Sequence, residues 1–479
     1  MKRLFLFSLS VAMGAIAFAS QPHWVSTTNT SPWQTNESPA TSTKKIKKPD
    51  IVINPSNTRQ EIKGFGTAFS ELSWLSLGKL GDEKRAEIMH ELFAPGVGCN
   101  FTINRLPIGN SDFSTHYHSY NDVPGDFEMK NFTLGCDQYA MLPMVKAAKA
   151  EQPEIKIWAS PWSPPTWFKR NNHYACSPGN GYEGAPPEAR FVNNGLATDG
   201  AIFEGTNGFI MDDKHLDAYA LYFGKFIDAY RNEGIDIFMV APQNEPNSPQ
   251  VFPSCCWTAA GLARFVGKHL GPEMEKRGVE IMCGTIERAN ELLCDTILTD
   301  SDCAKYIHTA GFQWAGKGAL PGIARRYPDH TIVATEHECG NGLNDWQGME
   351  YSWNLIKEYI NNGVNIYTYW NTSLIDGETS PWGWRQNSLI SVAKDGSWFR
   401  YNPEFYLMKH YSHFIKPGAR LIETSGLYDQ AIAFSNPDGS IILLAANLGD
   451  EAKSVSIRLG NETYIPTLAP HSINTFVLK

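Results

Sequence analysis

The sequence predicts an α/β protein, a (β/α)8 (TIM) barrel with an accessory antiparallel β-sandwich built from both chain ends. Three observations support this prediction. Eight short apolar segments, most of them separated by helical patterns, lie between residues 61 and 370. After Pro417-Gly418 the pattern changes to short alternating strands at hairpin spacing. A further strand-like segment, residues 51–53, precedes the first barrel segment and is available to the second module.

The start of the chain is typical of an export signal. Lys2 and Arg3 precede an apolar run that closes with Ala-Phe-Ala at positions 17–19. A positively charged N-terminal region, a short apolar run and a cleavage site of small residues indicate a signal peptide over residues 1–19. The run is too short for a membrane span. We therefore expect export to the periplasm or the extracellular space, with no membrane insertion.

The remaining chain divides into three parts. Residues 20–49 are rich in Ser, Thr, Asn, Pro and Lys, which predicts a flexible leader. The catalytic barrel is expected over residues 64–415, and the β-sandwich should combine residues 50–63 with residues 416–479. A C-terminal module of about 60 residues is small for a sandwich on its own, so a strand from before the barrel would complete it.

The individual elements follow from hydrophobic periodicity. The barrel strands are predicted at residues 61–68, 101–108, 155–161, 235–241, 280–284, 306–313, 331–335 and 365–370. The clearest helices are predicted at residues 82–93, 214–232, 258–276, 348–361 and 403–414. The C-terminal strands are predicted at residues 421–423, 431–435, 440–447, 454–459 and 473–478.

Composition excludes several classes of function. A net charge of −9 without a cluster of Lys and Arg argues against a nucleic-acid partner. The Gly-x-Gly-x-x-Gly match at 179–184 follows no strand and opens no helix, and Glu336-His337-Glu338 fits no helical zinc motif. We therefore expect no cofactor and no metal. Fourteen Trp suit a sugar-binding cleft, because indole rings stack on sugar faces.

Two carboxylates stand at the ends of predicted barrel strands. Gln243, Asn244 and Glu245 follow the apolar run 235–241, and Glu336 follows the run 331–335. The C-terminal ends of barrel strands carry the active site in this architecture. Glycoside hydrolases use a pair of carboxylates that face each other in this way. Periodicity alone leaves Glu338, two residues on, as an alternative to Glu336.

Longer motifs resemble glycoside hydrolase family 30, which contains acid β-glucosidase (glucosylceramidase) and microbial β-1,6-glucanases. These motifs are Asn-Glu-Pro at 244–246, Ala-Thr-Glu at 334–336, Gly-Phe-Gly at 64–66, Ala-Ser-Pro-Trp-Ser-Pro-Pro-Thr-Trp at 159–167 and Trp-Gly-Trp-Arg-Gln-Asn-Ser at 382–388. The resemblance extends from about residue 51 to the C-terminus. Asn-Glu-Pro alone occurs in many related barrels, whereas the two long motifs are much more specific.

The resemblance implies roles for single residues. Glu245 would be the general acid/base and Glu336 the nucleophile, in preference to Glu338. The predicted substrate-binding residues are Glu71, Trp162, Asn244, Gln313, Trp314 and Trp370. Two of these depart from glucosylceramidases: Glu71 stands where those enzymes have an Asp, and Gln313 where they have a His. A retaining pair would lie roughly 5–5.5 Å apart.

The leading hypothesis is an exported retaining β-glycosidase whose partner is a β-linked glycan or glycoside. It would cleave β-glucosidic bonds in glycans, as an endo-β-1,6-glucanase or an exo-β-glucosidase. The alternative is a glucosylceramidase acting on glycosphingolipids, or a related β-xylosidase, β-fucosidase or β-galactanase specificity. A distant alternative is a non-catalytic carbohydrate-binding barrel, which would be expected to lack one of the two carboxylates.

Overall fold

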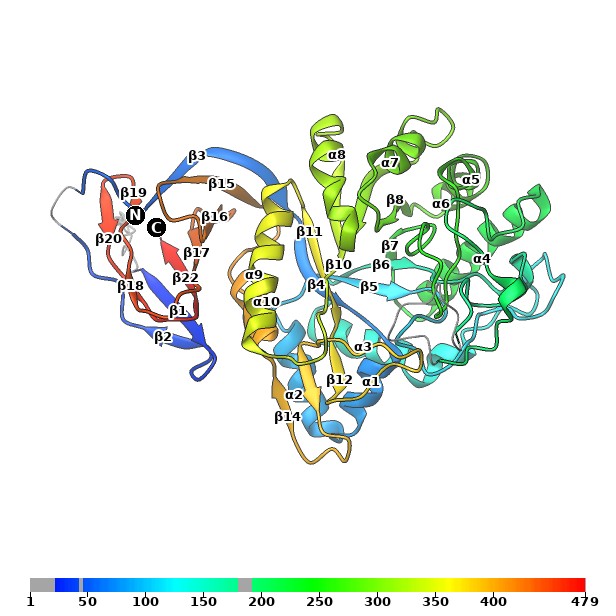
Figure 1. Cartoon of the computed structure of the whole chain (residues 1–479), viewed down its shortest axis with the longest axis horizontal. Helices are drawn as coiled ribbons and strands as arrows, with labels where there is room; N and C mark the ends of the chain where they lie inside the picture. Colours follow the sequence, from blue (N-terminus) through cyan, green and yellow to red (C-terminus); the bar gives the residue numbers. More distant parts are fainter. Residues whose placement is uncertain (1–21, 43–45, 180–191, 479) are drawn as a thin grey trace, which may run out of the picture.

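The computed structural model describes residues 22–42, 46–179 and 192–478. In Figure 1 a barrel with its helices occupies one side and a β-sheet made from the chain ends occupies the other. Strands β3 (Ile51–Ile62) and β15 (Ala419–Ser425) pair with each other and run from the sheet toward the barrel. The predicted signal peptide, residues 1–19, lies outside the described residues.

The barrel is closed by eight parallel strands in the order β10-β11-β4-β5-β6-β7-β8-β9. Their bounds are β4 (Gly64–Ala68), β5 (Ile103–Pro107), β6 (Lys156–Ser160), β7 (Ile237–Val240), β8 (Glu280–Ile286), β9 (Ile307–Gln313), β10 (Thr331–Glu336) and β11 (Ile366–Asn371). Each overlaps a predicted strand, so the barrel prediction is confirmed. All eight carboxyl ends therefore meet at one rim, which is where a barrel holds its functional side chains.

The helices surround the barrel (Figure 1). They are α1 (Glu71–Gly78), α2 (Asp82–Phe93), α3 (Met141–Glu151), α4 (Asp213–Asn232), α5 (Ala259–Phe265), α6 (Gly271–Glu275), α7 (Glu291–Leu298), α8 (Leu320–Arg326), α9 (Trp346–Asn361) and α10 (Pro403–Ser412). The helix predicted over residues 258–276 is interrupted by a π-helical turn at Val266–Leu270. Aromatic residues of α4, among them Tyr219, Phe223 and Phe226, are buried in the main core.

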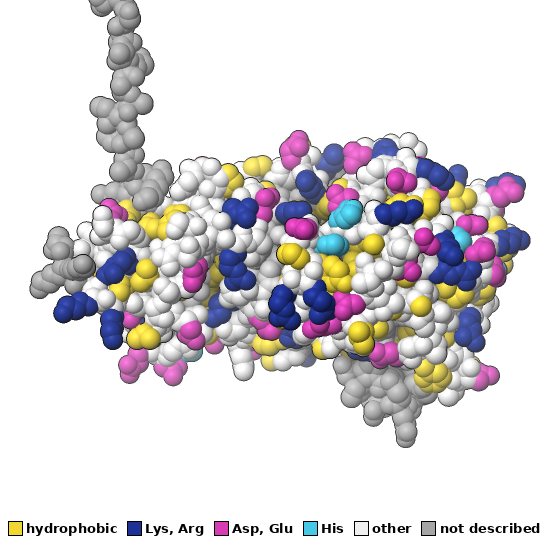
Figure 2. All heavy atoms as spheres, turned by 90° about the horizontal axis from the view of Figure 1, so that it is seen from above, with side chains coloured by type: hydrophobic (Ala, Val, Ile, Leu, Met, Phe, Trp, Pro, Cys, Tyr) yellow, Lys and Arg dark blue, Asp and Glu magenta, His cyan; other side chains and the backbone are white. Residues whose placement is uncertain are grey.

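Within the described residues, no helix combines the length and the apolar character needed to cross a lipid bilayer. Positively and negatively charged side chains are interspersed on the face seen in Figure 2.

The second module is a nine-stranded sheet in the order β2-β1-β22-β17-β16-β15-β3-β19-β20. Besides β3 and β15, it contains β1 (His23–Thr28), β2 (Gln34–Asn36), β16 (Ala431–Ser435), β17 (Ile441–Asn447), β19 (Ile457–Leu459), β20 (Glu462–Tyr464) and β22 (Ser472–Leu478). The strands β18 (Lys453–Ser454) and β21 (Thr467–Leu468) pair separately, as do β12 (Ser373–Ile375), β13 (Ile390–Val392) and β14 (Phe399–Tyr401). Ile51 and Ile53 pair with Ile457 and Leu459, which confirms the two-ended module.

The flexible leader predicted over residues 20–49 is wrong where β1 and β2 form. All six residues of β1 pair antiparallel with β22. Val25 and Thr27 are buried, and the Trp24 ring stacks on Phe476 with ring centroids 5.3 Å apart. A six-residue strand inside a Ser- and Thr-rich stretch has too few apolar positions to be detected from composition, and its partner lies at the far end of the chain.

Candidate active site

Glu245 lies just past the carboxyl end of β7, in a backbone conformation that few residues adopt. Its φ is +46°, in the left-handed region that non-glycine residues rarely occupy. The Glu245 N–H donates to Thr285 Oγ1 at 3.0 Å, and Asn244 forms an isolated parallel bridge with Thr285. Neighbouring β8 therefore holds the turn that presents Glu245, and strained backbone of this kind is concentrated at functional sites.

Glu336 is the last residue of β10, and positively polarised groups hold both of its oxygens. Arg105 Nη1 donates to Oε2 at 2.8 Å, and Trp314 Nε1 donates to Oε1 at 2.9 Å. The pairing of β10 with β9 shifts register between Ala334 and Glu336. Such an irregularity re-aims a side chain at the end of a strand.

The two carboxyl groups share one hydrogen-bond donor. Gln313 Nε2 donates to Glu245 Oε1 at 3.0 Å and to Glu336 Oε2 at 3.4 Å. These two oxygens can be no farther apart than the sum of the two distances, which is well short of the roughly 9 Å found in wide inverting pairs. The structure thus brings the two predicted carboxylates and Gln313 together at the barrel mouth.

Glu338 faces a different environment. Its carboxylate pairs with Lys317 Nζ at 2.7 Å and accepts a hydrogen bond from the Tyr351 hydroxyl. His337, between the two glutamates, is buried and hydrogen-bonded to Tyr367 and Ser352. Of the two glutamates that periodicity left open, the structure therefore places Glu336 opposite Glu245.

The electrostatic surroundings of the two glutamates differ. Burial, followed by the charge of Glu336, raises the pKa of Glu245 to about 7, against the opposing effects of Gln313 and Arg105. Burial also raises the pKa of Glu336, but Arg105, Trp314 and Gln313 all oppose that rise. Glu336 therefore has the stronger stabilisation as a carboxylate, and Glu245 is the group suited to carry a proton near neutral pH.

Arg105 on β5 is a site residue that the sequence reasoning missed. Its side chain is fully buried, and besides Glu336 it donates through Nη2 to Asn244 Oδ1 at 2.6 Å. Its guanidinium carbon lies 4.4 Å from the centre of the Trp162 ring. An Arg inside the apolar run 101–108 was the available signal, because a buried charge requires a partner.

Asp112, in the loop after β5, is a second missed residue. Its carboxyl is buried, and Oδ1 has no hydrogen-bond partner among the residues that the structure describes. Burial, followed by the charges of Glu336 and Glu245, holds the pKa of Asp112 well above its usual range. The charges of both glutamates therefore act on this buried carboxyl.

Among the described residues Glu71 shares no hydrogen bond with Glu245 or Glu336, and its role in substrate binding stays a prediction. Glu71 Oε2 accepts hydrogen bonds from the Thr115 N–H at 2.9 Å and from the Tyr139 hydroxyl. Its Oε1 lies 3.4 Å from His118 Nε2. These contacts hold Glu71 against the loop after β5, the loop that also carries Asp112.

The remaining predicted binding residues do converge. Trp162 and Trp370 stack with ring centroids 5.2 Å apart, beneath Arg105. Asn244 Oδ1 accepts from Arg105, from Thr285 Oγ1 and, at 3.4 Å, from Gln313 Nε2, and no described residue accepts from its amide nitrogen. The three donors fix the orientation of the amide, so its NH2 group is left to donate to a ligand.

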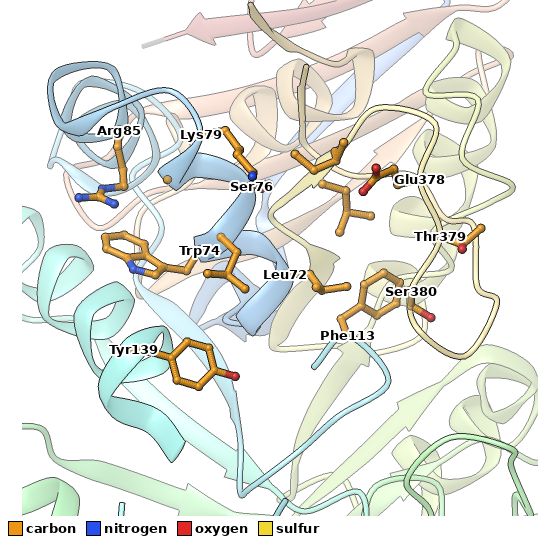
Figure 3. A pocket seen from close by; sticks show the side chains of 14 residues that line it. Leu72, Trp74, Ser76, Lys79, Arg85, Phe113, Tyr139, Glu378, Thr379 and Ser380 are labelled. Atoms are coloured by element: carbon orange, nitrogen blue, oxygen red, sulfur yellow. The ribbon is translucent and has the colours of Figure 1, made fainter. Parts of the chain in front are cut away.

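A cavity of about 550 Å³ has Phe113 in its wall (Figure 3). The Phe113 ring meets Trp370 edge-on, with centroids 5.9 Å apart. Trp74 and Leu72 of α1 line the cavity, and Tyr139 lies across from them. Neither Glu245 nor Glu336 belongs to its wall. Among the described residues, no group of three or more His, Cys, Asp or Glu side chains is arranged to hold a metal ion.

Sequence comparison identifies the family. Residues 62–189 and 185–415 match the glycosyl hydrolase family 30 TIM-barrel domain, and residues 418–476 match the family 30 β-sandwich domain. The protein belongs to glycoside hydrolase family 30. It is accordingly a glycosidase of the retaining type.

Curated relatives of this family 30 glycosidase carry two kinds of name. It is 27% identical to the lysosomal acid glucosylceramidase of Mus musculus over 461 residues, covering 90% of this chain and 83% of the relative. It is 25% identical to the endo-1,6-beta-D-glucanase neg1 of Aspergillus fumigatus over 447 residues, covering 88% and 86%.

Solved structures share the fold of this family 30 glycosidase. The endo-beta1,6-glucanase BT3312 superposes with a TM-score of 0.78 at 24% identity, covering 96% of this chain and 100% of that one. SrfJ from Salmonella typhimurium superposes with a TM-score of 0.80 at 20% identity, covering 95% and 99%.

Proposed function

We propose that this protein hydrolyses β-glucosidic bonds in glycans by double displacement, with Glu336 as nucleophile and Glu245 as acid/base. In the first step a Glu336 oxygen attacks the anomeric carbon while Glu245 donates its proton to the departing glycosidic oxygen. In the second step Glu245, now ionised, removes a proton from water, which attacks the same carbon and releases Glu336.

The single observation that carries this proposal is the Gln313 amide shared by the two carboxyl groups. Two glutamates on one donor are close enough for the nucleophile and the acid to act on one bond. They also influence each other's ionisation, which helps to keep Glu245 protonated while Glu336 is held ionised by Arg105 and Trp314. The Asn244 NH2 group is placed to donate to a hydroxyl of the bound sugar.

For the substrate we favour a glucan, acted on by endo-β-1,6-glucanase or exo-β-glucosidase cleavage. Fungal relatives named endo-1,6-beta-D-glucanases support this choice. Asp112 Oδ1 is buried and unpaired among the described residues, so it offers a partner to a hydroxyl of a bound glucosyl group, which both candidate substrates carry. The second candidate is a glucosylceramidase, which the similarly related glucosylceramidases of Mus musculus and Caenorhabditis elegans support.

The experiment is a substrate panel with product sizing. The purified enzyme would be incubated with β-1,6-glucan, aryl β-glycosides that differ only in the sugar, and glucosylceramide in mixed micelles. We expect β-1,6-glucan to be cleaved with the highest kcat/KM, and the aryl β-glucoside to exceed the β-xyloside, β-fucoside and β-galactoside. If glucosylceramide were turned over faster than any glucan, the glucan proposal would be wrong and glucosylceramide would be the substrate. Failure on every glycoside would reject the catalytic proposal.

We further propose that the enzyme is exported through residues 1–19. The charged start, apolar run and small-residue end support this proposal. Mass spectrometry of the N-terminus after expression in a secreting host would test it, with cleavage after Ala19 as the expected result.

A further inference from the structure

Glu287 directly follows β8 and has a buried carboxyl group without hydrogen-bond partners. The residue is 3% exposed, and neither Oε1 nor Oε2 has a partner among the described residues. Arg288 Nη1 lies 3.5 Å from Oε1, too far for a good hydrogen bond. Buried carboxyl groups nearly always have hydrogen-bond partners, so two unpaired oxygens indicate a group that binds a ligand.

This carboxyl lies beside the acid/base. Thr285, two residues earlier, holds the Glu245 N–H, and Arg288, the next residue, donates through Nη2 to the Asn247 carbonyl at 3.3 Å. The segment around Glu287 is therefore bound to both sides of Glu245. Burial, followed by the charge of Glu245, holds the pKa of Glu287 well above its usual range. The protonated form of Glu287 is therefore favoured, and a protonated carboxyl can both donate and accept a hydrogen bond.

The contacts of its neighbours place Glu287 between the acid/base and the surface. Thr285 holds the Glu245 N–H, and Arg288 reaches the surface, where it pairs with Glu204 at 3.1 Å. Glu287 lies on the short segment that joins these two contacts, beside Glu245 and toward the rim.

The leaving group of the substrate lies on the side of the site next to Glu245. In the proposed mechanism Glu336 bonds to the anomeric carbon, and Glu245 protonates the oxygen that departs. A group beside Glu245, on the way to the rim, faces whatever is attached through that oxygen. Hydroxyl groups would satisfy both Glu287 oxygens, whereas a hydrocarbon chain would leave them unpaired and desolvated.

We propose that Glu287 is a leaving-group-binding residue whose carboxyl hydrogen-bonds to a hydroxyl of the departing sugar. It makes the enzyme selective for carbohydrate over hydrocarbon leaving groups. This inference rests on the proposed function and deepens it, because it names the chemistry required on the far side of the scissile bond.

The test compares two substrates that share a glucosyl group and an unactivated alkoxide leaving group. One is a β-1,6-linked glucose tetrasaccharide, and the other is octyl β-glucoside, whose leaving group carries no hydroxyls. The quantity measured is the ratio of their kcat/KM values. Because both leaving groups need the same proton from Glu245, this ratio cancels any general loss of catalysis.

We expect Glu287→Leu to lower the ratio by on the order of tenfold, the value of one lost hydrogen bond together with an unpaired hydroxyl. Glu287→Gln keeps a neutral donor and acceptor in place and should retain the ratio within about threefold. The matched control is Glu291→Leu, the same change at a surface position of α7 that pairs with Arg326. It should leave the ratio unchanged.

Equal losses on both substrates in Glu287→Leu would overturn the inference and make Glu287 a structural residue. So would a Glu287→Gln variant as defective as Glu287→Leu. If Glu287→Leu fails to fold, Glu287→Met provides the same comparison with a flexible side chain. A wild-type enzyme that cleaves octyl β-glucoside but no oligosaccharide would refute the sugar leaving group and leave the glycosidase standing. Cleavage of neither substrate, nor of an aryl β-glucoside, would reject the proposed function itself.

Discussion

Replacing Glu245 with Gln tests the acid/base assignment through two independent measurements, the rate of hydrolysis and the pH dependence of stability. The first measurement is the rate. Loss of proton assistance should reduce hydrolysis of β-1,6-glucan by about 10²–10⁴-fold. An aryl β-glucoside with a good leaving group needs little assistance, so its first step should survive while the second step, which needs Glu245 as base, becomes slow. Stopped-flow kinetics should then show a burst of released phenol, and azide, which needs no base, should restore turnover and yield a β-glucosyl azide.

The second measurement is the free energy of unfolding as a function of pH. Burial and the charge of Glu336 raise the pKa of Glu245 from 4.5 to about 7. The folded protein therefore binds this proton more tightly than the unfolded chain does. The stabilisation is fully present below pH 4.5 and is lost as pH rises through 7, with a magnitude on the order of 3 kcal/mol. Glu245→Gln has no proton to lose, so it should gain stability relative to the wild type between pH 4.5 and pH 8.

Denaturant unfolding of both proteins at both pH values measures this effect as a double difference. Shifts in all other groups cancel, provided that they are unaffected by the substitution. The reasoning would be refuted if the wild type and Glu245→Gln changed stability in parallel with pH. It would also be refuted if azide failed to accelerate the variant on the aryl substrate. The matched catalytic control is Glu338→Gln, whose carboxylate pairs with Lys317 outside the cluster and which should keep normal pH dependence and no azide response.

Three further predictions follow from the site and from the sheet. Glu336→Gln should abolish hydrolysis of every substrate and covalent labelling by a 2-fluoro-glucoside, detected by mass spectrometry; labelling that persists there but disappears in Glu338→Gln would reverse the nucleophile assignment. Trp314→Phe removes the hydrogen bond that lowers the pKa of Glu336, so kcat/KM should fall by about tenfold and its acidic limb should move to higher pH; an unchanged limb would contradict this role. Deleting the chain through Thr28 exposes the edge of β22 and should lower the melting temperature in calorimetry, whereas an unchanged value would mean that β1 adds no stability.

The sequence by itself determined the architecture and the pair of carboxylates. Alternation of short apolar runs with helical patterns depends on local periodicity, which any single chain displays. The positions of Glu245 and Glu336 could be predicted for the same reason. Each directly follows a buried strand, and a parallel barrel must bring the carboxyl ends of its strands to one rim. The long motif at 159–167 likewise indicated Trp162 from sequence.

Tertiary structure decided which of the neighbouring side chains face the pair. Strand β10 ends at Glu336 after a shift in register, so Glu338 lies beyond the strand, and no periodicity in the sequence shows where the strand ends. In the loop after β5, which has no repeating pattern, Asp112 is buried and is influenced by the charges of both glutamates, and Thr115 and Tyr139 bind Glu71.

Contacts between strands that lie far apart in the chain could not be predicted from the sequence either. Arg105 acts because strands β5, β7 and β10 close around it, and β1 is ordered because β22 lies beside it. Local patterns fix which segments become strands, since propensity and burial period act over a few residues. Contacts between residues hundreds of positions apart depend on how those segments pack, and only the folded chain brings them together.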